Sequence, residues 1–443
     1  MTLLLTLALP WWSALPFVVL LALIVLAPMV MANFWHHYYK PTAVVLGLSV
    51  IAYFGFGLHD FHTPIETAVE YLSFVIFLGA LFVAAGGIFI HADFKVTPLL
   101  NILYLFMGAI FANLIGTTGA AMLLVRPFIR LNKYKLAPYH LVFFIFIVCN
   151  VGGALTPIGD PPLFLGYLKG VPFSFTISHL FGYWALAMVL LLGIFYALER
   201  KNKWTTTADS IQSSNKIVVG GKRNLFWLTI IVAAVFLDPN FHDWLPYLDL
   251  DGKKISFIRE LIQLCAATLC YFTANKTALN ANEFSFEPIL EVVFLFFGLF
   301  FTMMPALKLV AAYAITPEGQ SVFTTSSMYW AAGFFSSFLD NAPTYLNFLT
   351  AAMAKFGKDI NVPSEVMAFA KGDYLAYIIS ISLGSVFFGA MTYIGNGPNL
   401  MVKSIAEHLG VKMPSFIQYI TKYALVYLLP VLVIVFLVMK WLG

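Results

Sequence analysis

Charge is scarce in this sequence. Lys, Arg, Asp and Glu make up 10% of the 443 residues, whereas hydrophobic residues make up 61%. No soluble fold can hide that much apolar surface, and the apolar runs do not alternate with polar residues as the strands of a membrane barrel do. The composition therefore predicts an all-α polytopic membrane protein in a lipid bilayer.

Several functional classes lack their signatures here. Three cysteines, all in or beside apolar segments, imply no disulfide framework. The sequence has no Walker A string, which excludes a pump driven by its own ATPase, and none of the common intramembrane protease motifs. We therefore expect no enzyme. Basic loops on one side of a membrane account for the net charge of +4, so neither nucleic acid nor a resident cofactor is expected.

Two similar polar strings interrupt long apolar segments. One is Thr-Pro-Ile-Gly-Asp-Pro-Pro at 156–162, and the other is Thr-Tyr-Ile-Gly-Asn-Gly-Pro-Asn at 392–399. Gly and Pro weaken or remove helical hydrogen bonds, so these strings predict broken helices over 137–168 and 374–404. Broken helices in corresponding positions of two halves indicate the binding site of a secondary transporter.

Two further segments predict re-entrant hairpins. Segment 98–130 is too long for one bilayer crossing, which takes about 20 residues, and too short for two. It carries a polar stretch at 113–119, and segment 326–350 carries another at 338–344. Each stretch is expected to form a hairpin tip at membrane depth. Matching Asn113 with Asn341 makes Ala112 the counterpart of Asp340.

The glutamate pair, the hairpin and the broken helix recur in the same order in both halves, which indicates a repeat. A pair of glutamates precedes each hairpin, and a broken helix follows it. We expect a first repeat over 1–198, a cytoplasmic linker at 199–223 and a second repeat over 224–443. About ten spanning segments result, together with the two hairpins.

Loop charge predicts orientation. Stretch 199–223 holds six basic residues against two acidic ones, which favours the cytoplasm. Loop 238–251 holds four aspartates and no Lys or Arg, and 41–94 also lacks both basic residues. The two repeats are then inverted relative to each other, with both chain ends on the outer side.

These motifs resemble a known family. The strings at 113–120, 152–162 and 338–344 are similar to those of the ion transporter superfamily, and most of all to NhaD-type sodium/proton antiporters and their citrate-transporter-like relatives. The resemblance implies a scaffold domain, a mobile transport domain that bears both hairpins, elevator-like alternation and a homodimer in the plasma (inner) membrane. The Ser-Asn-Thr signature of dicarboxylate carriers is not present in that form.

Asp160 and Asp340 are the strongest candidates for chemistry. A carboxylate at membrane depth costs at least ~2.5 kcal/mol unless it is paired, hydrated or protonated. If the halves pack about a pseudo-two-fold axis, both acids approach one cavity that holds either a proton or a hard cation. The alternative for Asp160 is a helix cap, because Asp followed by Pro is a common helix start.

Neutral oxygens surround both breaks and suit sodium, as they suit other hard cations. The candidates that accompany the two acids are Asn113, Thr117, Thr118, Thr156, Asn341, Thr344, Thr392, Asn396 and Asn399. Each residue alone could instead form an interhelical hydrogen bond or a turn. Glu70 and Glu291 are candidates for a proton relay, or they simply complement the positive ends of their helices.

Two transport functions compete. Sodium/proton antiport is favoured, because Asp160 and Asp340 would repel a polyvalent anion and neither break contains Lys or Arg. Cation-coupled citrate or dicarboxylate transport is the alternative, because the half-helices that begin at both breaks direct N-termini at the site.

Overall fold

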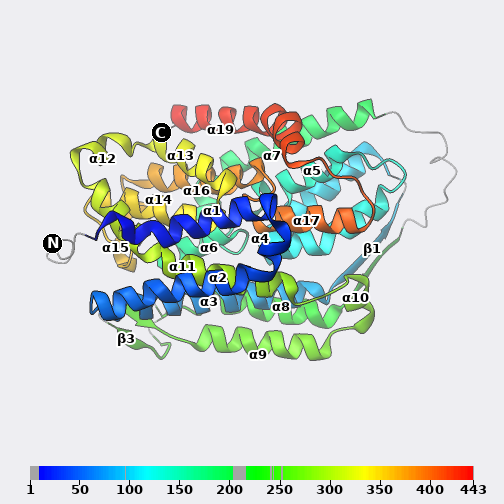
Figure 1. Ribbon diagram of the computed structural model, residues 1–443. Helices are drawn as coiled ribbons and strands as arrows, with labels where there is room; N and C mark the ends of the chain where they lie inside the picture. The colour runs from blue at the N-terminus through cyan, green and yellow to red at the C-terminus, as the bar shows by residue number, and fades with distance from the viewer. Residues whose placement is uncertain are drawn as a thin grey trace.

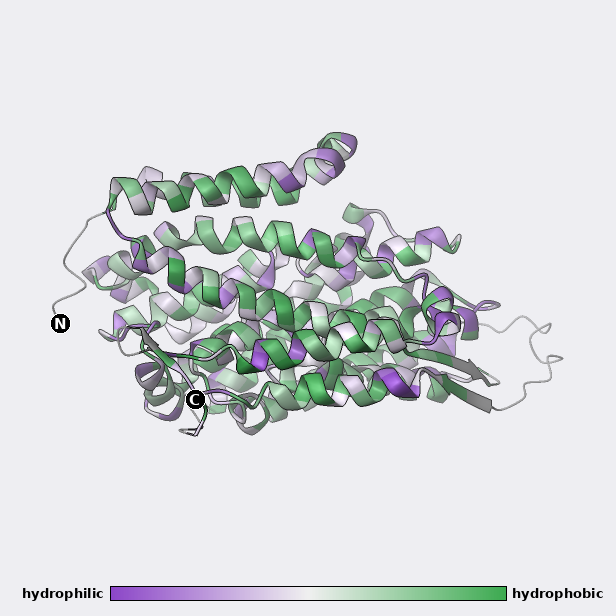
Figure 2. Cartoon of the chain, turned by 90° about the horizontal axis from the view of Figure 1, so that it is seen from below, coloured by the Kyte–Doolittle hydropathy of each residue, from purple (hydrophilic) through white to green (hydrophobic). Residues whose placement is uncertain are grey.

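The computed structural model describes residues 9–94, 96–202, 216–239, 242, 244–250 and 253–442. Most of the predicted linker, residues 203–215, lies outside this part of the chain, as do residues 1–8 of the first repeat. Long helices run along one common direction (Figure 1). Hydrophobic residues cover most of their length, and hydrophilic residues gather mainly toward the two ends (Figure 2). The predicted all-α membrane fold is confirmed.

Helices account for nearly all regular structure. The first half contains η1 (Trp11–Ala14), α1 (Leu15–Val30), α2 (Ala32–Ala52), η2 (Tyr53–Gly57), α3 (His62–Gly86), β1 (Phe89–Asp93), α4 (Pro98–Leu131), α5 (Pro138–Ile147), η3 (Val151–Leu155), α6 (Pro161–Lys169) and α7 (Phe175–Lys201). The second half contains β2 (Lys216–Gly220), α8 (Lys222–Ala234), β3 (Leu248–Leu250), β4 (Lys253–Ile255), α9 (Ile258–Thr273), α10 (Lys276–Ala281), α11 (Glu287–Ala314), α12 (Pro317–Val322), α13 (Thr325–Phe338), α14 (Asn341–Lys355), α15 (Pro363–Lys371), α16 (Leu375–Phe388), η5 (Gly389–Met391), α17 (Gly397–His408), α18 (Phe416–Tyr419), η6 (Ile420–Leu428) and α19 (Leu429–Leu442).

Fewer helices are long enough to cross a membrane than the sequence suggested. Eight in the described chain are long and apolar enough, and a ninth is obtained if the bent pair α15–α16 counts as one span. The expected number was about ten. Two of the expected spanning segments, 225–237 and 256–274, form α8 and α9, which have 13 and 16 residues and fall short of the ~20 residues of a full crossing.

The corresponding helices α3 and α11 run in opposite directions. The Tyr71 hydroxyl on α3 donates to the Val293 carbonyl on α11 at 2.8 Å, while Lys308 near the other end of α11 pairs with Asp60 just before α3 at 3.1 Å. The start of α3 therefore lies beside the end of α11, so these corresponding helices are antiparallel. An inverted repeat requires such an antiparallel pair, and the division of the chain into two inverted repeats stays a prediction.

Both polar-tipped segments fold back on themselves. Helix α4 is broken at Gly116, whose φ of 76° and ψ of 155° lie outside the helical region. The arms then meet: Tyr104 donates to the Leu124 carbonyl at 2.8 Å, and Asn101 donates to Asn132 at 2.8 Å. In the second half, α13 and α14 form the equivalent hairpin around Leu339 and Asp340.

The hairpins enter from opposite ends of the bundle. The base of the first lies beside the end of α7, because Asn202 donates to the Lys135 carbonyl at 3.3 Å. The base of the second follows α12 at the other end, where Lys355 donates to the Phe323 carbonyl at 2.6 Å (Figure 1). The two tips therefore meet inside the bundle.

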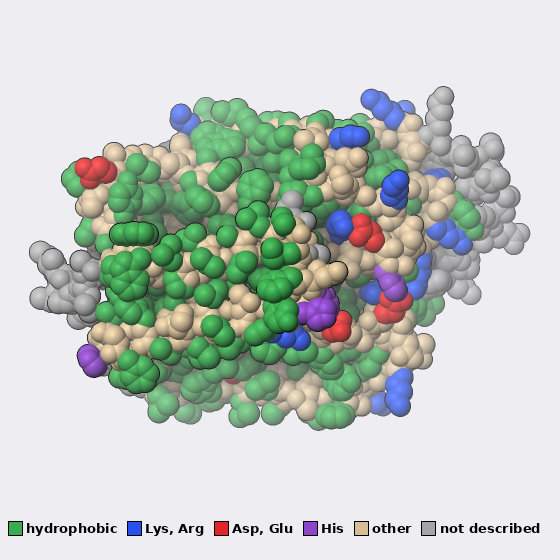
Figure 3. All heavy atoms as spheres, in the orientation of Figure 1, with side chains coloured by type: hydrophobic (Ala, Val, Ile, Leu, Met, Phe, Trp, Pro, Cys, Tyr) green, Lys and Arg blue, Asp and Glu red, His purple; other side chains and the backbone are tan. Residues whose placement is uncertain are grey.

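Two small antiparallel sheets mark the bundle ends. β1 pairs with β2, with Phe89 opposite Gly220, and joins the two halves at the end where α7 finishes. β3 pairs with β4 at the opposite end, where the described chain also begins and finishes (Figure 1). On the face drawn in Figure 3, Lys and Arg gather mainly at the β1–β2 end. The cytoplasmic placement of that end stays a prediction from the loop charges.

Candidate functional site

Asp160 lies at the centre of a buried polar cluster. Its side chain is 1% exposed, and its backbone is extended immediately before α6. Although it occupies the N-cap position, it makes no side-chain capping hydrogen bond. The carboxylate instead turns toward the two hairpin tips and the second break. The cap role proposed from the sequence therefore describes the position of Asp160 but not the contacts of its carboxylate.

Three neutral side chains donate to this carboxylate. Thr117 Oγ1 and Asn396 Nδ2 donate to Asp160 Oδ1 at 2.9 and 3.0 Å, and Asn341 Nδ2 donates to Oδ2 at 2.6 Å. Thr117 comes from the first hairpin tip, Asn341 from the second, and Asn396 from the second broken helix. Four elements of the two repeats thus converge on one negative charge, and none of the three donors is charged.

One oxygen in this cluster has no donor. Asn341 is fully buried, and its Oδ1 has no hydrogen-bond partner among the described residues. A buried, unpaired acceptor costs about 1–3 kcal/mol, so it is a strong reason to look for a ligand there. This oxygen belongs to the same amide that donates to Asp160. The pair supplies one carboxylate and one free carbonyl oxygen, both of them ligand types for a hard cation.

Asn150 joins the two broken helices, although it stands outside both polar strings of the sequence. Its Nδ2 donates to Asn399 Oδ1 at 2.8 Å, and its Oδ1 accepts from Asn396 at 3.2 Å. The sequence already makes Asn150 an additional candidate, because it lies just before Gly152 and Gly153 and faces the same break. Asn150 thus accepts a hydrogen bond from Asn396, which also donates to Asp160.

Two matching hydroxyl contacts define the equivalence of the repeats. Thr156 Oγ1 donates to the Asn113 carbonyl at 2.6 Å, and Thr392 Oγ1 donates to the Ser337 carbonyl at 2.5 Å. Asn113 therefore corresponds to Ser337 rather than to Asn341. The pairing of Asp340 with Ala112, made by aligning residue types, was wrong by four residues.

The corrected alignment of the two hairpins explains which tip residues contact Asp160. Four residues beyond Asn113 and Ser337 lie Thr117 and Asn341, and both donate to Asp160. The counterpart of Asp340 is Gly116. Both occupy the bend of their hairpin, where Gly116 provides a backbone conformation that other residues rarely adopt and Asp340 provides a helix cap.

Two of the candidate asparagines form hydrogen bonds with backbone groups of the broken helices. Asn113 donates to the Gly152 carbonyl at 2.6 Å and accepts from the Leu155 amide at 2.8 Å. Asn399 donates to the carbonyls of Gly389 and Thr392 at 2.8 and 2.9 Å. Backbone groups freed by a helix break need such partners away from water. These asparagines therefore maintain the breaks rather than face a ligand.

Asp340 and Thr344 lie at the second tip but outside the hydrogen-bonded cluster. Asp340 Oδ1 accepts from the Ala342 amide at 3.0 Å and caps α14. Thr344 Oγ1 donates to the Asp340 carbonyl at 3.0 Å. Asp340 is half-buried, and no hydrogen bond joins it to Asp160 among the described residues. Asp340 caps α14 beside the site, and its role in binding a cation or a proton stays a prediction.

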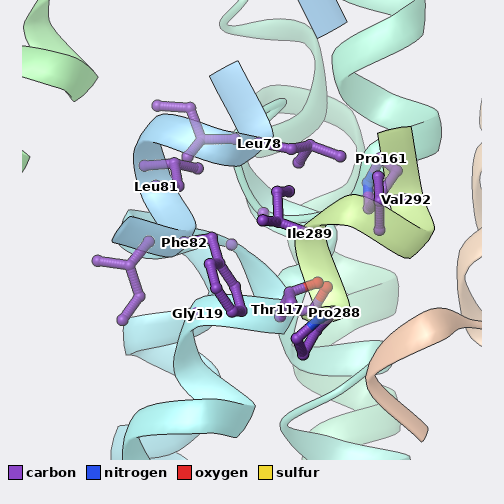
Figure 4. A pocket seen from close by; sticks show the side chains of 14 residues that line it. Leu78, Leu81, Phe82, Thr117, Gly119, Pro161, Pro288, Ile289 and Val292 are labelled. Atoms are coloured by element: carbon purple, nitrogen blue, oxygen red, sulfur yellow. The ribbon is translucent and has the colours of Figure 1, made fainter. Parts of the chain in front are cut away.

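A cavity of about 40 Å³ adjoins the first tip (Figure 4). The cavity is lined by Leu78, Leu81 and Phe82 of α3, by Pro288, Ile289 and Val292 of α11, by the tip residues Ile115–Gly119, and by Ile158, Gly159 and Pro161 on either side of Asp160. The half-buried Thr118 lines this cavity, as does Thr117, whose hydroxyl donates to Asp160. The space thus lies between the antiparallel pair α3–α11 and the elements that hold the carboxylate.

The glutamates proposed as proton relays lie apart from the cluster. Glu70 pairs with Lys169 at the end of α6 at 2.9 Å, and Lys169 also donates to Asn361 at 2.8 Å. Glu291 is exposed on the surface of α11. Their relay role stays a prediction. Among the described residues, no group of three or more His, Cys, Asp or Glu side chains could hold a metal ion.

Comparison with known families gives a match over nearly the whole chain. A family model described as "Putative citrate transport" matches residues 6–440. The chain belongs to this citrate-transport family. The resemblance to citrate-transporter-like members of the ion transporter superfamily is confirmed, and with it a transport function in a multi-pass membrane protein. No curated protein matches the chain.

Proposed function

We propose that this citrate-transport family member is a secondary transporter that exchanges sodium for protons by alternating access, with Asp160 as the shared binding group. The observation that carries the proposal is the pairing of the buried Asp160 carboxylate with the unpartnered Oδ1 of Asn341. A proton and a hard cation are the two ligands that suit such a pair, because each neutralises the carboxylate. The two ligands would exclude each other.

The position of the site supports coupling to a conformational change. Asp160 is contacted from both hairpin tips, which enter from opposite ends of the bundle. The adjoining cavity lies at the boundary with α3 and α11 (Figure 4). Relative movement across this boundary would expose Asp160 first to one side and then to the other. Neutralising the carboxylate would favour that movement, because an isolated charge in an apolar interior is costly.

Cation-coupled citrate or dicarboxylate transport is the second candidate, and the family description favours it. The first residues of α6 and of the second arm of α4 line the cavity, so two helix N-termini face it and favour an anion. Against this stands the Asp160 carboxylate, whose hydrogen-bond partners are all neutral. Two unit charges of the same sign about 4 Å apart repel by about 4 kcal/mol at an effective dielectric near 20.

Reconstituted protein separates the two functions. Proteoliposomes with an imposed pH gradient receive Na⁺, K⁺ or citrate separately, and proton movement is followed with a pH-sensitive dye. Antiport predicts that Na⁺ alone dissipates the gradient, with citrate neither needed nor accumulated. Movement of Na⁺ or protons that occurs only with citrate, together with uptake of labelled citrate, would replace antiport with the second candidate.

A further inference from the structure

A second cavity, with a basic lining, lies at the β1–β2 end of the bundle. It is an open groove of about 540 Å³ between the turn that joins α4 to α5 and the loop that follows α17. Lys133 and Pro138 form one side, Lys412 lies on the other, and Gln418, Lys422 and Tyr423 complete it. This set defines the basic groove, which both repeats build together.

The charge of the basic groove is uncompensated. Lys133, Lys412 and Lys422 are exposed and line it with no Asp or Glu among its lining residues. None of the three lysines forms an ion pair in the described part of the chain. The acidic Glu407 of α17 pairs with Lys403 at 2.8 Å. Three positive charges therefore face one hollow without a protein counter-ion.

Other groups around the groove also suit an oxyanion. Pro138 is the first residue of the ten-residue helix α5, so the positive end of that helix borders the groove. Gln418 and Tyr423 add an amide and a hydroxyl, which can donate hydrogen bonds. Apolar side chains, among them Leu136 and Met413, line the remainder. A charged head attached to an apolar tail would match both parts.

We propose that the basic groove binds a phosphate-class oxyanion. The two sources of that chemistry are the headgroup of an anionic phospholipid and free phosphate from the adjoining water. Basic pockets between membrane helices on the cytoplasmic side are suited to anionic headgroups, and loop charge places this end in the cytoplasm. None of the groove residues is a hydrogen-bond partner of Asp160, whose donors are Thr117, Asn341 and Asn396.

The test compares two triple variants of the full chain. The groove variant carries Lys133→Gln, Lys412→Gln and Lys422→Gln. The control carries Lys222→Gln, Arg223→Gln and Lys276→Gln, which removes three exposed positive charges from the same end of the bundle but outside the groove. Native mass spectrometry measures binding of phosphatidylglycerol against phosphatidylcholine, and thermal unfolding in neutral detergent is followed as inorganic phosphate is added.

Wild type and control are expected to prefer phosphatidylglycerol by at least about tenfold, and the groove variant to lose that preference. Inorganic phosphate could instead stabilise wild type and control but not the groove variant, with no protein preferring phosphatidylglycerol. That result would identify free phosphate as the source of the oxyanion. A third variant with Lys→Arg at the same three positions keeps the charge and should bind like wild type, which separates binding from misfolding. The proposal is overturned if the groove and control variants behave alike with both probes.

Discussion

The two broken helices share a frame and differ in charge. In each, a threonine hydroxyl donates to a backbone carbonyl of the hairpin in the same half of the chain. A half-helix with Pro in its first turn follows each break. The first break carries Asp160 where the second carries Asn396, and the amide donates to the acid at 3.0 Å. The shared parts build the site, whereas a single difference supplies its charge. The two breaks together therefore present one carboxylate rather than two.

The hairpin tips differ in the same way. Gly116 allows the first bend through its backbone, and Asp340 caps the helix that follows the second. The residue after each of them, Thr117 or Asn341, reaches Asp160. Asp340 thus forms a helix cap, whereas Asp160 makes no cap bond, and the proposed function uses the Asp160 carboxylate to bind the ion. We therefore expect separate roles for the two acids that the sequence analysis placed together.

The largest expected effect comes from removing the difference in charge. Asp160→Asn makes the two breaks alike and eliminates the only carboxylate in the cluster. We expect sodium-driven proton exchange in proteoliposomes to fall by at least about 100-fold, because an amide can neither take up a proton nor neutralise Na⁺. Asp340→Asn is the matched control. Asn caps a helix as well as Asp does, so exchange should fall far less. Equal loss in both variants would contradict the separate roles.

The reverse change duplicates the charge. Asn396→Asp places a second carboxylate within hydrogen-bonding distance of Asp160, and two charges about 4 Å apart repel by about 4 kcal/mol at an effective dielectric near 20. Exchange should fall about tenfold or more at pH 8 and recover toward pH 6, where the pair can share a proton. Combining this change with Asp160→Asn should restore part of the exchange, since one carboxylate returns to the cluster. A single variant as active as wild type at both pH values would show that residue 396 does not face the acid.

Stability separates the two tips more modestly. Gly116→Ala forces a side chain into a conformation that costs about 1–3 kcal/mol, whereas Asp340→Ala loses a cap of about 1 kcal/mol. Thermal unfolding in detergent should therefore rank Gly116→Ala as the less stable variant. Gly357→Ala, another glycine with positive φ but on the surface with open space around it, controls for backbone strain away from the tips. The opposite ranking would contradict the assigned tip geometry.

The smallest effect tests the shared frame. Thr156→Val and Thr392→Val each remove one hydroxyl that donates to a hairpin carbonyl, which should cost about 1 kcal/mol in both cases. Both residues sit beside buried backbone, so thermal unfolding should show similar losses of stability. A large loss in one variant alone would mean that the two breaks are not built alike.

The sequence was sufficient to locate the hairpins and the breaks, because Gly, Pro and polar clusters disrupt a helix wherever they interrupt an apolar segment. It was not sufficient for the register between repeats. Asn113 and Asn341 share a residue type, but the equivalence lies in backbone carbonyls, and the second repeat contains α15 between its hairpin and its broken helix. Which oxygens remain free also could not be predicted, since Asn113 and Asn399 are occupied only once the chain has folded.

Competition between sodium and protons is the most direct test of the central claim. The half-maximal Na⁺ concentration for exchange is measured in wild-type proteoliposomes from about pH 6 to pH 9. If both ligands share Asp160, that concentration rises as the pH falls, by up to about tenfold per pH unit for each proton displaced, while the maximal rate at saturating Na⁺ changes less. A half-maximal concentration that stays constant over the whole range would contradict a single shared carboxylate.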